Sequence, residues 1–158
     1  MAYPTVDAPY GLVPINLIGG QPYAGSTRQM KIASNYGTDI FNGDVVKRAA
    51  DGTIQKETGT ATVTATGVIG VFVGVSYTDP NTKQKVFKQY YPASTVASDI
   101  MAYVVDDPDA LFKVAVVSSG TTIAGTGYGS IGSNAALVQN AGSTSTGNSK
   151  VAIGSVNT

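Results

Sequence analysis

The sequence contains no cysteine and no histidine among its 158 residues. The lack of cysteine excludes disulfide bonds and thiol nucleophiles. The lack of histidine excludes imidazole bases, and the two absences together exclude ordinary zinc sites. Most familiar hydrolytic mechanisms depend on one of these groups. We therefore expect a protein that is not an enzyme and that uses no metal and no cofactor.

Charged residues are few and balanced, with ten Lys and Arg against ten Asp and Glu. No summed field would attract the chain to nucleic acid or to an acidic membrane surface, so we expect neither as a partner. The longest apolar run, residues 68–75, contains two glycines and is too short to span a bilayer. The first residues do not combine a basic region with an apolar one, which leads us to expect synthesis and assembly in a cytoplasm.

The chain length suits one domain that buries roughly 70% of its unfolded surface. Residues 1–27 are distinct, because they carry one charge, Asp7, and four prolines, each of which removes a donor from any strand ladder. We predict an extended arm here and a single β-rich domain over residues 28–158. The prolines are Pro4, Pro9, Pro14 and Pro22.

The arm carries more apolar surface than a solvated linker normally does. It could pack along its own domain or dock on a neighbouring subunit or a larger partner, and we favour the second alternative. The apolar side chains that we predict to bind the partner are Tyr3, Val6, Tyr10, Leu12, Val13, Ile15, Leu17 and Ile18.

Two runs rich in Val, Ile, Tyr and Phe, residues 100–105 and 110–117, flank the acidic turn 106–109. This pattern predicts a strand, a tight connection and a second strand, with the other strands laid around this unit. Asp107 can accept a backbone N–H from a residue or two further on, and Pro108 has its φ already set for a turn.

Further strand signals occur along the domain. Residues 44–48 and 53–56 bracket an Asp-Gly turn and predict a hairpin. Residues 68–75 are apolar on both alternating sets, which predicts a strand covered on both faces. Residues 83–91 predict a polar edge strand that carries three lysines. Weaker patterns predict a strand at 27–34, a loop or edge strand at 58–66, short helical turns within 93–99 and 133–138, and a closing strand at 150–153.

Together these patterns predict a mostly β fold, a small antiparallel barrel or sandwich with little helix. Alternation places Val71, Val73 and Val75 on one face of their strand and Phe72 on the other. The predicted core consists of Val45, Ile54, Val71, Phe72, Val73, Val104, Leu111, Phe112, Val114 and Val116.

The sequence contains three candidate chemical sites, and the pattern that indicates each of them is weak. Residues 127–132 match G-x-G-x-x-G, but no acidic residue follows Asp109, so we interpret them as a glycine loop rather than a dinucleotide fingerprint. Asp106, Asp107 and Asp109 do not have the spacing of a calcium loop, and a turn with a capping role is favoured. The spacing of the carboxylates nominates no pair for glycoside chemistry.

Several segments, taken in order, resemble a small capsid-surface protein of tailed bacteriophages, of the kind carried by phages of cyanobacteria and marine bacteria. Each segment alone is a weak turn or strand signal, and the specificity lies in their order. The segments are the Tyr3-Pro4 opening, 43–47, 70–80, 89–93, 104–109 with Phe112, and 146–149 with Val151.

The resemblance implies a decoration or cement protein, which binds the outer surface of the virion head and clamps neighbouring major capsid subunits against internal genome pressure. It carries over no catalytic residue. It also favours a homotrimer, with a dimer as the alternative, because cement proteins often occupy local three-fold positions. The nearly uncharged residues 110–158, where only Lys113 and Lys150 are charged, would supply the subunit interface.

Two other functions remain open. One is another virion part, such as a head-fibre or tail-associated protein. The other is a carbohydrate-binding β module with stacking tyrosines, although filling of a sheet surface or interface is the favoured role for these rings. The tyrosines in question are Tyr23, Tyr36, Tyr90, Tyr91 and Tyr128.

Overall fold

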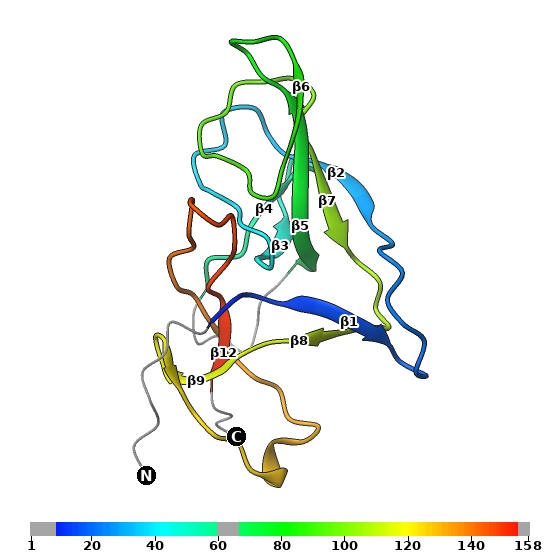
Figure 1. Ribbon diagram of the computed structural model, residues 1–158, viewed down its shortest axis with the longest axis vertical. Helices are drawn as coiled ribbons and strands as arrows, with labels where there is room; N and C mark the ends of the chain where they lie inside the picture. The colour runs from blue at the N-terminus through cyan, green and yellow to red at the C-terminus, as the bar shows by residue number, and fades with distance from the viewer. Residues whose placement is uncertain (1–8, 60–66, 155–158) are drawn as a thin grey trace.

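The computed structural model describes residues 9–59 and 67–154, and the regular secondary structure of these residues is almost entirely β-strand (Figure 1). One 3-10 turn, η1 (Tyr128–Ser130), is the only helical element in the described part of the chain. The predicted mostly β fold with little helix is therefore confirmed. The strands are β1 (Val13–Leu17), β2 (Arg28–Lys31), β3 (Val45–Arg48), β4 (Ile54–Lys56), β5 (Val68–Thr78), β6 (Lys85–Lys88), β7 (Met101–Val105), β8 (Ala110–Lys113), β9 (Val116–Ser119), β10 (Thr122–Ile123), β11 (Leu137–Val138) and β12 (Ala152–Gly154).

The strands belong to three sheets. The largest has the order β2-β7-β5-β3-β4, with β6 also paired to β5. A four-stranded sheet has the order β10-β9-β12-β11, and β1 and β8 form a two-stranded ribbon. All pairings are antiparallel except that of β12 with β9. None of these sheets, as formed by the described residues, closes into a barrel, and the layered arrangement is consistent with a sandwich.

Strand β5 is the centre of the largest sheet because its eleven residues pair with three other strands. Its first half pairs with β3, its second half pairs with β6, and β7 runs along its other edge. The predicted hairpin of β3 and β4 is confirmed, and Gly52 in its turn has a φ of 84°. The predicted polar edge strand is also present as β6, which pairs only with β5 among the described strands.

The largest sheet curls around its own core. Its two outer strands approach each other at a single parallel bridge between Ile32 and Ile54, and the Tyr36 hydroxyl accepts the Lys56 backbone N–H at 3.1 Å. The concave face of the sheet therefore encloses most of the apolar side chains. The core cluster consists of Ile32, Ile40, Val46, Ile54, Phe72, Val75, Tyr77, Tyr91, Ile100, Ala102 and Val104.

A β-bulge changes the side-chain alternation along β5. Phe72 pairs with Val104 and Gly74 pairs with Tyr103, so Val73 is an extra residue without a partner on β7. Phe72 and Val75 consequently point into the same core, although they are three residues apart. The expectation that Val71 and Val75 share a face was wrong, because the bulge reverses the parity between them.

The acidic turn 106–109 connects two different sheets. β7 belongs to the large sheet and β8 pairs with β1, so the two strands flanking the turn do not pair with each other. The sheet is accordingly organised around β5 and not around this unit. The predicted turn chemistry is confirmed, because Asp107 Oδ1 accepts the Asp109 N–H at 2.9 Å and the Asp107 carbonyl accepts the Ala110 N–H at 3.1 Å.

The remaining predicted strands and helical turns are confirmed only in part. Strands β2 and β12 confirm the signals at 27–34 and 150–153 approximately. The helical turn expected within 133–138 was wrong, because this stretch contains strand β11, and the segment 93–99 forms no helix either. Most of the predicted loop or edge strand at 58–66 lies outside the described residues.

Half of the predicted core residues are fully buried, and these all belong to the large sheet. The other half, those at 73, 111, 112, 114 and 116, are half-buried, except that Leu111 is 43% exposed. All but one of these five lie in or beside β8 and β9. Local β propensity cannot distinguish a strand of a two-stranded ribbon from a strand inside a sheet, which is why Leu111 was assigned wrongly.

The two phenylalanines Phe72 and Phe112 should therefore differ in their contribution to stability. Phe72 is fully buried in the core, whereas Phe112 is half-buried on the inner side of the β1–β8 ribbon. Phe72→Ala should lower the free energy of unfolding by about 3 to 5 kcal/mol, and Phe112→Ala by roughly half as much or less. Urea unfolding followed by circular dichroism measures both variants. An equal loss for the two variants would contradict this assignment of the core.

Candidate functional site

The described part of the arm forms strand β1 and packs along its own domain. β1 pairs with β8 in antiparallel register, from Val13 opposite Lys113 to Leu17 opposite Ala110. Pro14 is compatible with this strand because a two-stranded ribbon leaves one edge of each strand without a ladder. Residues 9–18 therefore pack along their own domain in the single chain, and docking on a partner stays a prediction.

A close crossing of two glycines anchors this segment to the domain. The Gly11 N–H donates to the Val151 carbonyl at 3.2 Å, and the Leu12 N–H donates to the Gly43 carbonyl at 3.0 Å. Gly11 has a φ of 77°, and a Cβ atom there would lie 2.8 Å from the Gly43 carbonyl oxygen. Only glycine satisfies both conditions, so this crossing determines where β1 begins.

Below the crossing lies a buried polar network centred on Asp44. The Asp44 carboxylate accepts hydrogen bonds from the Phe41 N–H at 2.8 Å and the Ser149 hydroxyl at 2.6 Å, and it pairs with Lys56 Nζ at 2.8 Å. The Ser149 hydroxyl also accepts the Val151 N–H at 3.0 Å. The side chains of Asp44 and Lys56 are 1% and 11% exposed, so solvent screens their interaction only weakly. Three distant segments of the chain are thereby held together.

Two other carboxylates stabilise the large sheet. Burial alone would raise the pKa of Glu57, but the Gly59 N–H at 2.6 Å and Lys47 at 3.3 Å outweigh it and hold the pKa below its ordinary value. The pKa of Asp99 is held well below its usual range by hydrogen bonds from Thr78 and Lys85. The Asp99–Lys85 pair is nearly half exposed, so it adds little to stability.

The β1–β8 ribbon has one face turned to the domain and one face turned outward. The inner side chains, including Pro14 and Phe112, are half-buried, and Phe112 lines an apolar groove of about 340 Å³ with Val45 and Val71 of the large sheet. On the outer side, Val13 and Leu111 are 41% and 43% exposed. The ribbon thus covers the convex face of the sheet and presents its own apolar side chains to solvent.

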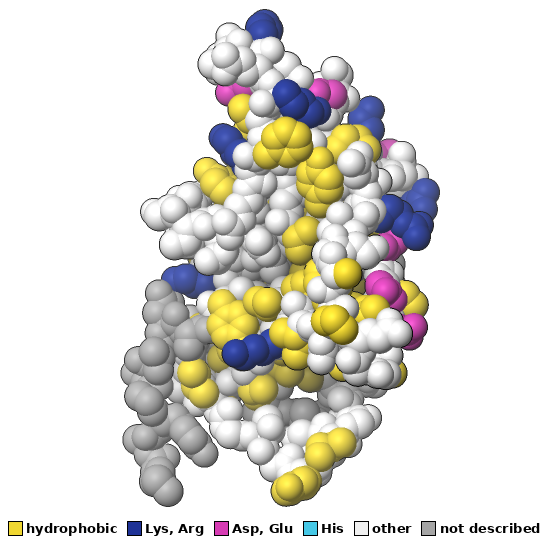
Figure 2. Space-filling model, turned by 45° about the vertical axis from the view of Figure 1, so that its right-hand side comes forward, with side chains coloured by type: hydrophobic (Ala, Val, Ile, Leu, Met, Phe, Trp, Pro, Cys, Tyr) yellow, Lys and Arg dark blue, Asp and Glu magenta, His cyan; other side chains and the backbone are white. Residues whose placement is uncertain are grey.

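A second β-bulge enlarges this outer face. The register between β1 and β8 shifts between Pro14 and Asn16, so Ile15 has no partner on β8 and is 50% exposed. Ile18 follows directly after β1 and is 64% exposed, while its N–H donates to the Asp109 carbonyl at 2.8 Å. Figure 2 shows hydrophobic side chains gathered over the lower half of the molecule, where few charged side chains are visible. We name the four residues Val13, Ile15, Ile18 and Leu111 the ribbon face.

The eight arm residues predicted from the sequence therefore fall into three groups. Val13, Ile15 and Ile18 lie on the ribbon face, and Tyr3 and Val6 lie outside the described residues. The remaining three are half-buried against the domain; they are Tyr10, Leu12 and Leu17. Sequence reasoning assigned Leu111 to the core, and only its pairing opposite Asn16 of β1 reveals its place on this surface.

A separate apolar pair projects from the glycine loop. Tyr128 and Ile131 are 92% and 75% exposed, and η1 between the flanking glycines holds them on one short turn. This loop lies at the lower end of Figure 1. No α-helix follows η1 in the described residues.

Among the tyrosines considered for carbohydrate stacking, Tyr128 alone is exposed. The ring of Tyr90 stacks on Phe41 with ring centroids 5.6 Å apart. Tyr91 is fully buried beside Tyr36, and burial raises the pKa of the Tyr91 hydroxyl. Most of these rings therefore have packing roles and form no continuous stacking surface.

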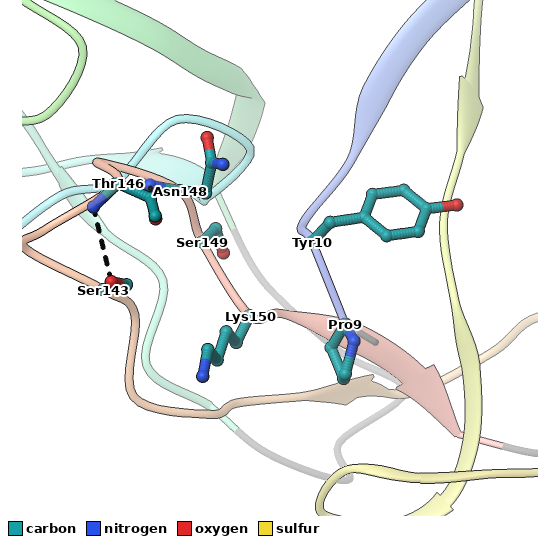
Figure 3. A pocket seen from close by; sticks show the side chains of 7 residues that line it. All are labelled: Pro9, Tyr10, Ser143, Thr146, Asn148, Ser149 and Lys150. Carbon is teal, nitrogen blue, oxygen red and sulfur yellow. Dashed lines mark hydrogen bonds between the residues drawn. The ribbon is translucent and has the colours of Figure 1, made fainter. Parts of the chain in front are cut away.

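A polar cleft of about 390 Å³ lies beside the start of the arm (Figure 3). Its hydroxyl groups come from the loop before β12, where Ser143 Oγ accepts the Thr146 N–H at 3.4 Å. In Figure 3 the Tyr10 side chain points away from Ser143 and Thr146. Lys113 Nζ lies 5.9 Å from the centre of the Tyr10 ring. The residues lining this cleft include no carboxylate, but the hydroxyl of Ser149, which also lines it, donates to the buried Asp44 carboxylate at 2.6 Å.

Two further observations concern the described residues. Within residues 9–59 and 67–154, no three carboxylates lie close enough together to hold a metal ion. In the same ranges, no helix is long and apolar enough to cross a membrane.

Comparisons with known proteins give no match: no family model, no curated protein and no solved structure matches this chain.

Single and double substitutions at the buried Asp44–Lys56 pair should differ in their effect on the free energy of unfolding. Asp44→Val leaves the Lys56 ammonium buried without its partner and should lower the free energy of unfolding by about 3 to 5 kcal/mol. The double substitution Asp44→Val with Lys56→Met removes both charges and should recover the part of this loss that comes from the unpaired ammonium, while the Phe41 N–H and the Ser149 hydroxyl stay without their acceptor. Thermal and urea unfolding measure both variants. A double variant as unstable as the single one would show that the ion pair itself is not the dominant contribution.

Proposed function

We propose that this protein is a non-enzymatic structural component of a phage virion, which binds the outer surface of the head and stabilises the capsid shell. The resemblance of several segments, taken in their order along the chain, to capsid-surface proteins of tailed bacteriophages supports this function. The observation that carries it in the structure is the ribbon face, an apolar surface on a two-stranded element that is already ordered. The partner at this face would be the major capsid protein.

The shape of the ribbon suits attachment to a large, fixed surface. Its inner side is held by the Gly11 crossing and by the pairing of β1 with β8, so docking would not require these residues to be ordered. Four apolar side chains that are 41% to 64% exposed can each lose further surface to a partner. A pre-ordered apolar face of this kind favours a stable contact over a transient one.

Substitutions on the ribbon face test this proposal. The double substitution Ile15→Asp with Ile18→Asp places two carboxylates where apolar contact is expected, and it should weaken attachment to undecorated expanded heads at least about tenfold. Co-sedimentation of purified protein with such heads measures attachment. Because both side chains are exposed, the free energy of unfolding should change by less than about 1 kcal/mol.

Val96 provides the matched control because it is 59% exposed on the loop between Tyr91 and Ile100, away from the ribbon. Val96→Asp makes the same chemical change at a comparable exposure and should leave attachment unchanged. Full occupancy of heads by the Ile15 and Ile18 variant would contradict the assignment of the ribbon face.

We also propose that the protein assembles with itself, with a trimer favoured over a dimer. The stretch from 110 to 158 carries two charges in total, and among its described residues the most exposed apolar side chains are those of Tyr128 and Ile131. A closed cyclic assembly would bury this pair, and a pair of large apolar side chains at the centre of an interface is typical of such contacts.

The oligomeric state of the isolated protein tests this second proposal. Sedimentation equilibrium at micromolar concentration should give three times the mass of one chain. Tyr128→Ser with Ile131→Ser should shift the distribution to monomer without unfolding, because both side chains are exposed in a single chain. A wild-type protein that remains monomeric at high micromolar concentration would contradict self-assembly in solution.

A further inference from the structure

One end of the curled large sheet is open. A cleft of about 410 Å³ lies at this end. It is bordered by the first residues of β2, β4 and β5, by the last residue of β3 and by the residue after β7. A volume of this size is within the range of binding clefts for small ligands or short peptide segments. We name this cleft, lined by Arg28, Lys31, Arg48, Ile54, Ile69 and Asp106, the sheet mouth.

The sheet mouth has a local excess of positive charge in a chain whose net charge is zero. Three cationic residues and one acidic residue, Asp106, line it, and the Asp106 carboxylate pairs with Arg28 Nε at 2.8 Å. Lys31 and Arg48 form no ion pair with any residue in the described ranges. The Asp106 contact orients the Arg28 guanidinium while leaving donors of this group for another acceptor.

The floor of the sheet mouth is apolar. Ile54 is buried, and Ile69 and Met30 are half-buried against the core. An anion in the mouth would therefore lie between cationic side chains and an apolar floor, where the effective dielectric constant is lower than at an open surface. The site suits a carboxylate carried on a partly apolar segment better than a small, fully hydrated ion.

Beside the mouth lies an unpaired strand edge. β2 pairs with β7 from Arg28 opposite Val104 to Lys31 opposite Met101, and no described strand pairs with its other edge. The single bridge between Ile32 and Ile54 closes the gap just beyond this point. The backbone groups of this four-residue strand that point away from β7 are thus available next to the cationic residues, and an extended peptide can add to such an edge.

We propose that the sheet mouth binds an extended acidic peptide segment of another protein, which adds to the free edge of β2 and places its carboxylates against Arg28, Lys31 and Arg48. The inference rests on the proposed function only for the source of the segment, which would be a capsid subunit. It involves a surface different from the ribbon face, so the two sites would contact the partner independently. Two features favour this ligand: the excess positive charge of the sheet mouth and the unpaired edge of β2.

Titration of the full-length protein with a fluorescent peptide tests the inference. The probe has the sequence Thr-Glu-Val-Asp-Thr-Glu, with blocked ends, and the matched probe replaces its acidic residues with Gln and Asn. Fluorescence anisotropy should show saturable binding of the acidic peptide that weakens with added salt, and at least about tenfold weaker binding of the neutral one. Hydrogen exchange should slow at those backbone amides of residues 28–31 that point away from β7 when the acidic peptide binds.

Variants connect this binding to the mouth. Arg48→Gln and Lys31→Gln should each weaken binding of the acidic peptide, the former about tenfold, because each removes one charge-assisted contact. Lys83→Gln, on the exposed turn between β5 and β6, is the matched control and should leave binding unchanged. All three side chains are exposed, so circular dichroism should show unchanged folding.

Four outcomes would overturn the inference: no saturable binding, equal binding of the neutral peptide, equal binding by the Arg48→Gln variant, or tighter binding of phosphate or a single-stranded oligonucleotide. The measurement uses no heads, so its failure is distinguishable from a failure of the proposed function. If the ribbon-face variant fails to attach to heads while wild-type protein does not bind the peptide, only the present inference is wrong.

Discussion

The candidate interface depends on the hydrogen bonds and the ion pair made by the buried Asp44 carboxylate. Asp44 holds the loop at Phe41, strand β4 through Lys56 and the C-terminal segment through Ser149. The backbone of Gly43, next to Asp44, is the surface on which Gly11 crosses. Because the crossing determines where β1 starts, the position of the ribbon follows from a polar network that lies beneath it.

The ribbon has two roles at once. Its inner side shields Val45 and Val71 on the convex face of the large sheet, and its outer side carries the apolar ribbon face. Since the large sheet already encloses a core on its concave side, the second layer does not need many residues to complete the fold. A two-stranded layer can therefore retain apolar side chains on its outer side, at the proposed contact with a capsid subunit.

Strand register, including two β-bulges, explains several features that alternation along one strand does not predict. The extra residue in β5 places Phe72 and Val75 in one core, and the extra residue in β1 exposes Ile15. A bulge depends on the register of a partner strand, which alternation along one strand does not contain. The same limitation explains Leu111, whose exposure depends on its pairing with β1, and the missing contact between β7 and β8.

By itself, the sequence determined the elements whose causes are local. These are the β-rich fold, the hairpin at Gly52 and the Asp107 turn, because β propensity, positive φ and side-chain hydrogen bonds to nearby backbone groups act within a few residues. The tertiary structure alone decided which strands pair, which face of the arm is exposed, and that cationic residues from β2 and β3 meet at one open end of the sheet. These features arise from contacts between residues far apart in the chain, and such contacts are determined by the packing of the whole domain.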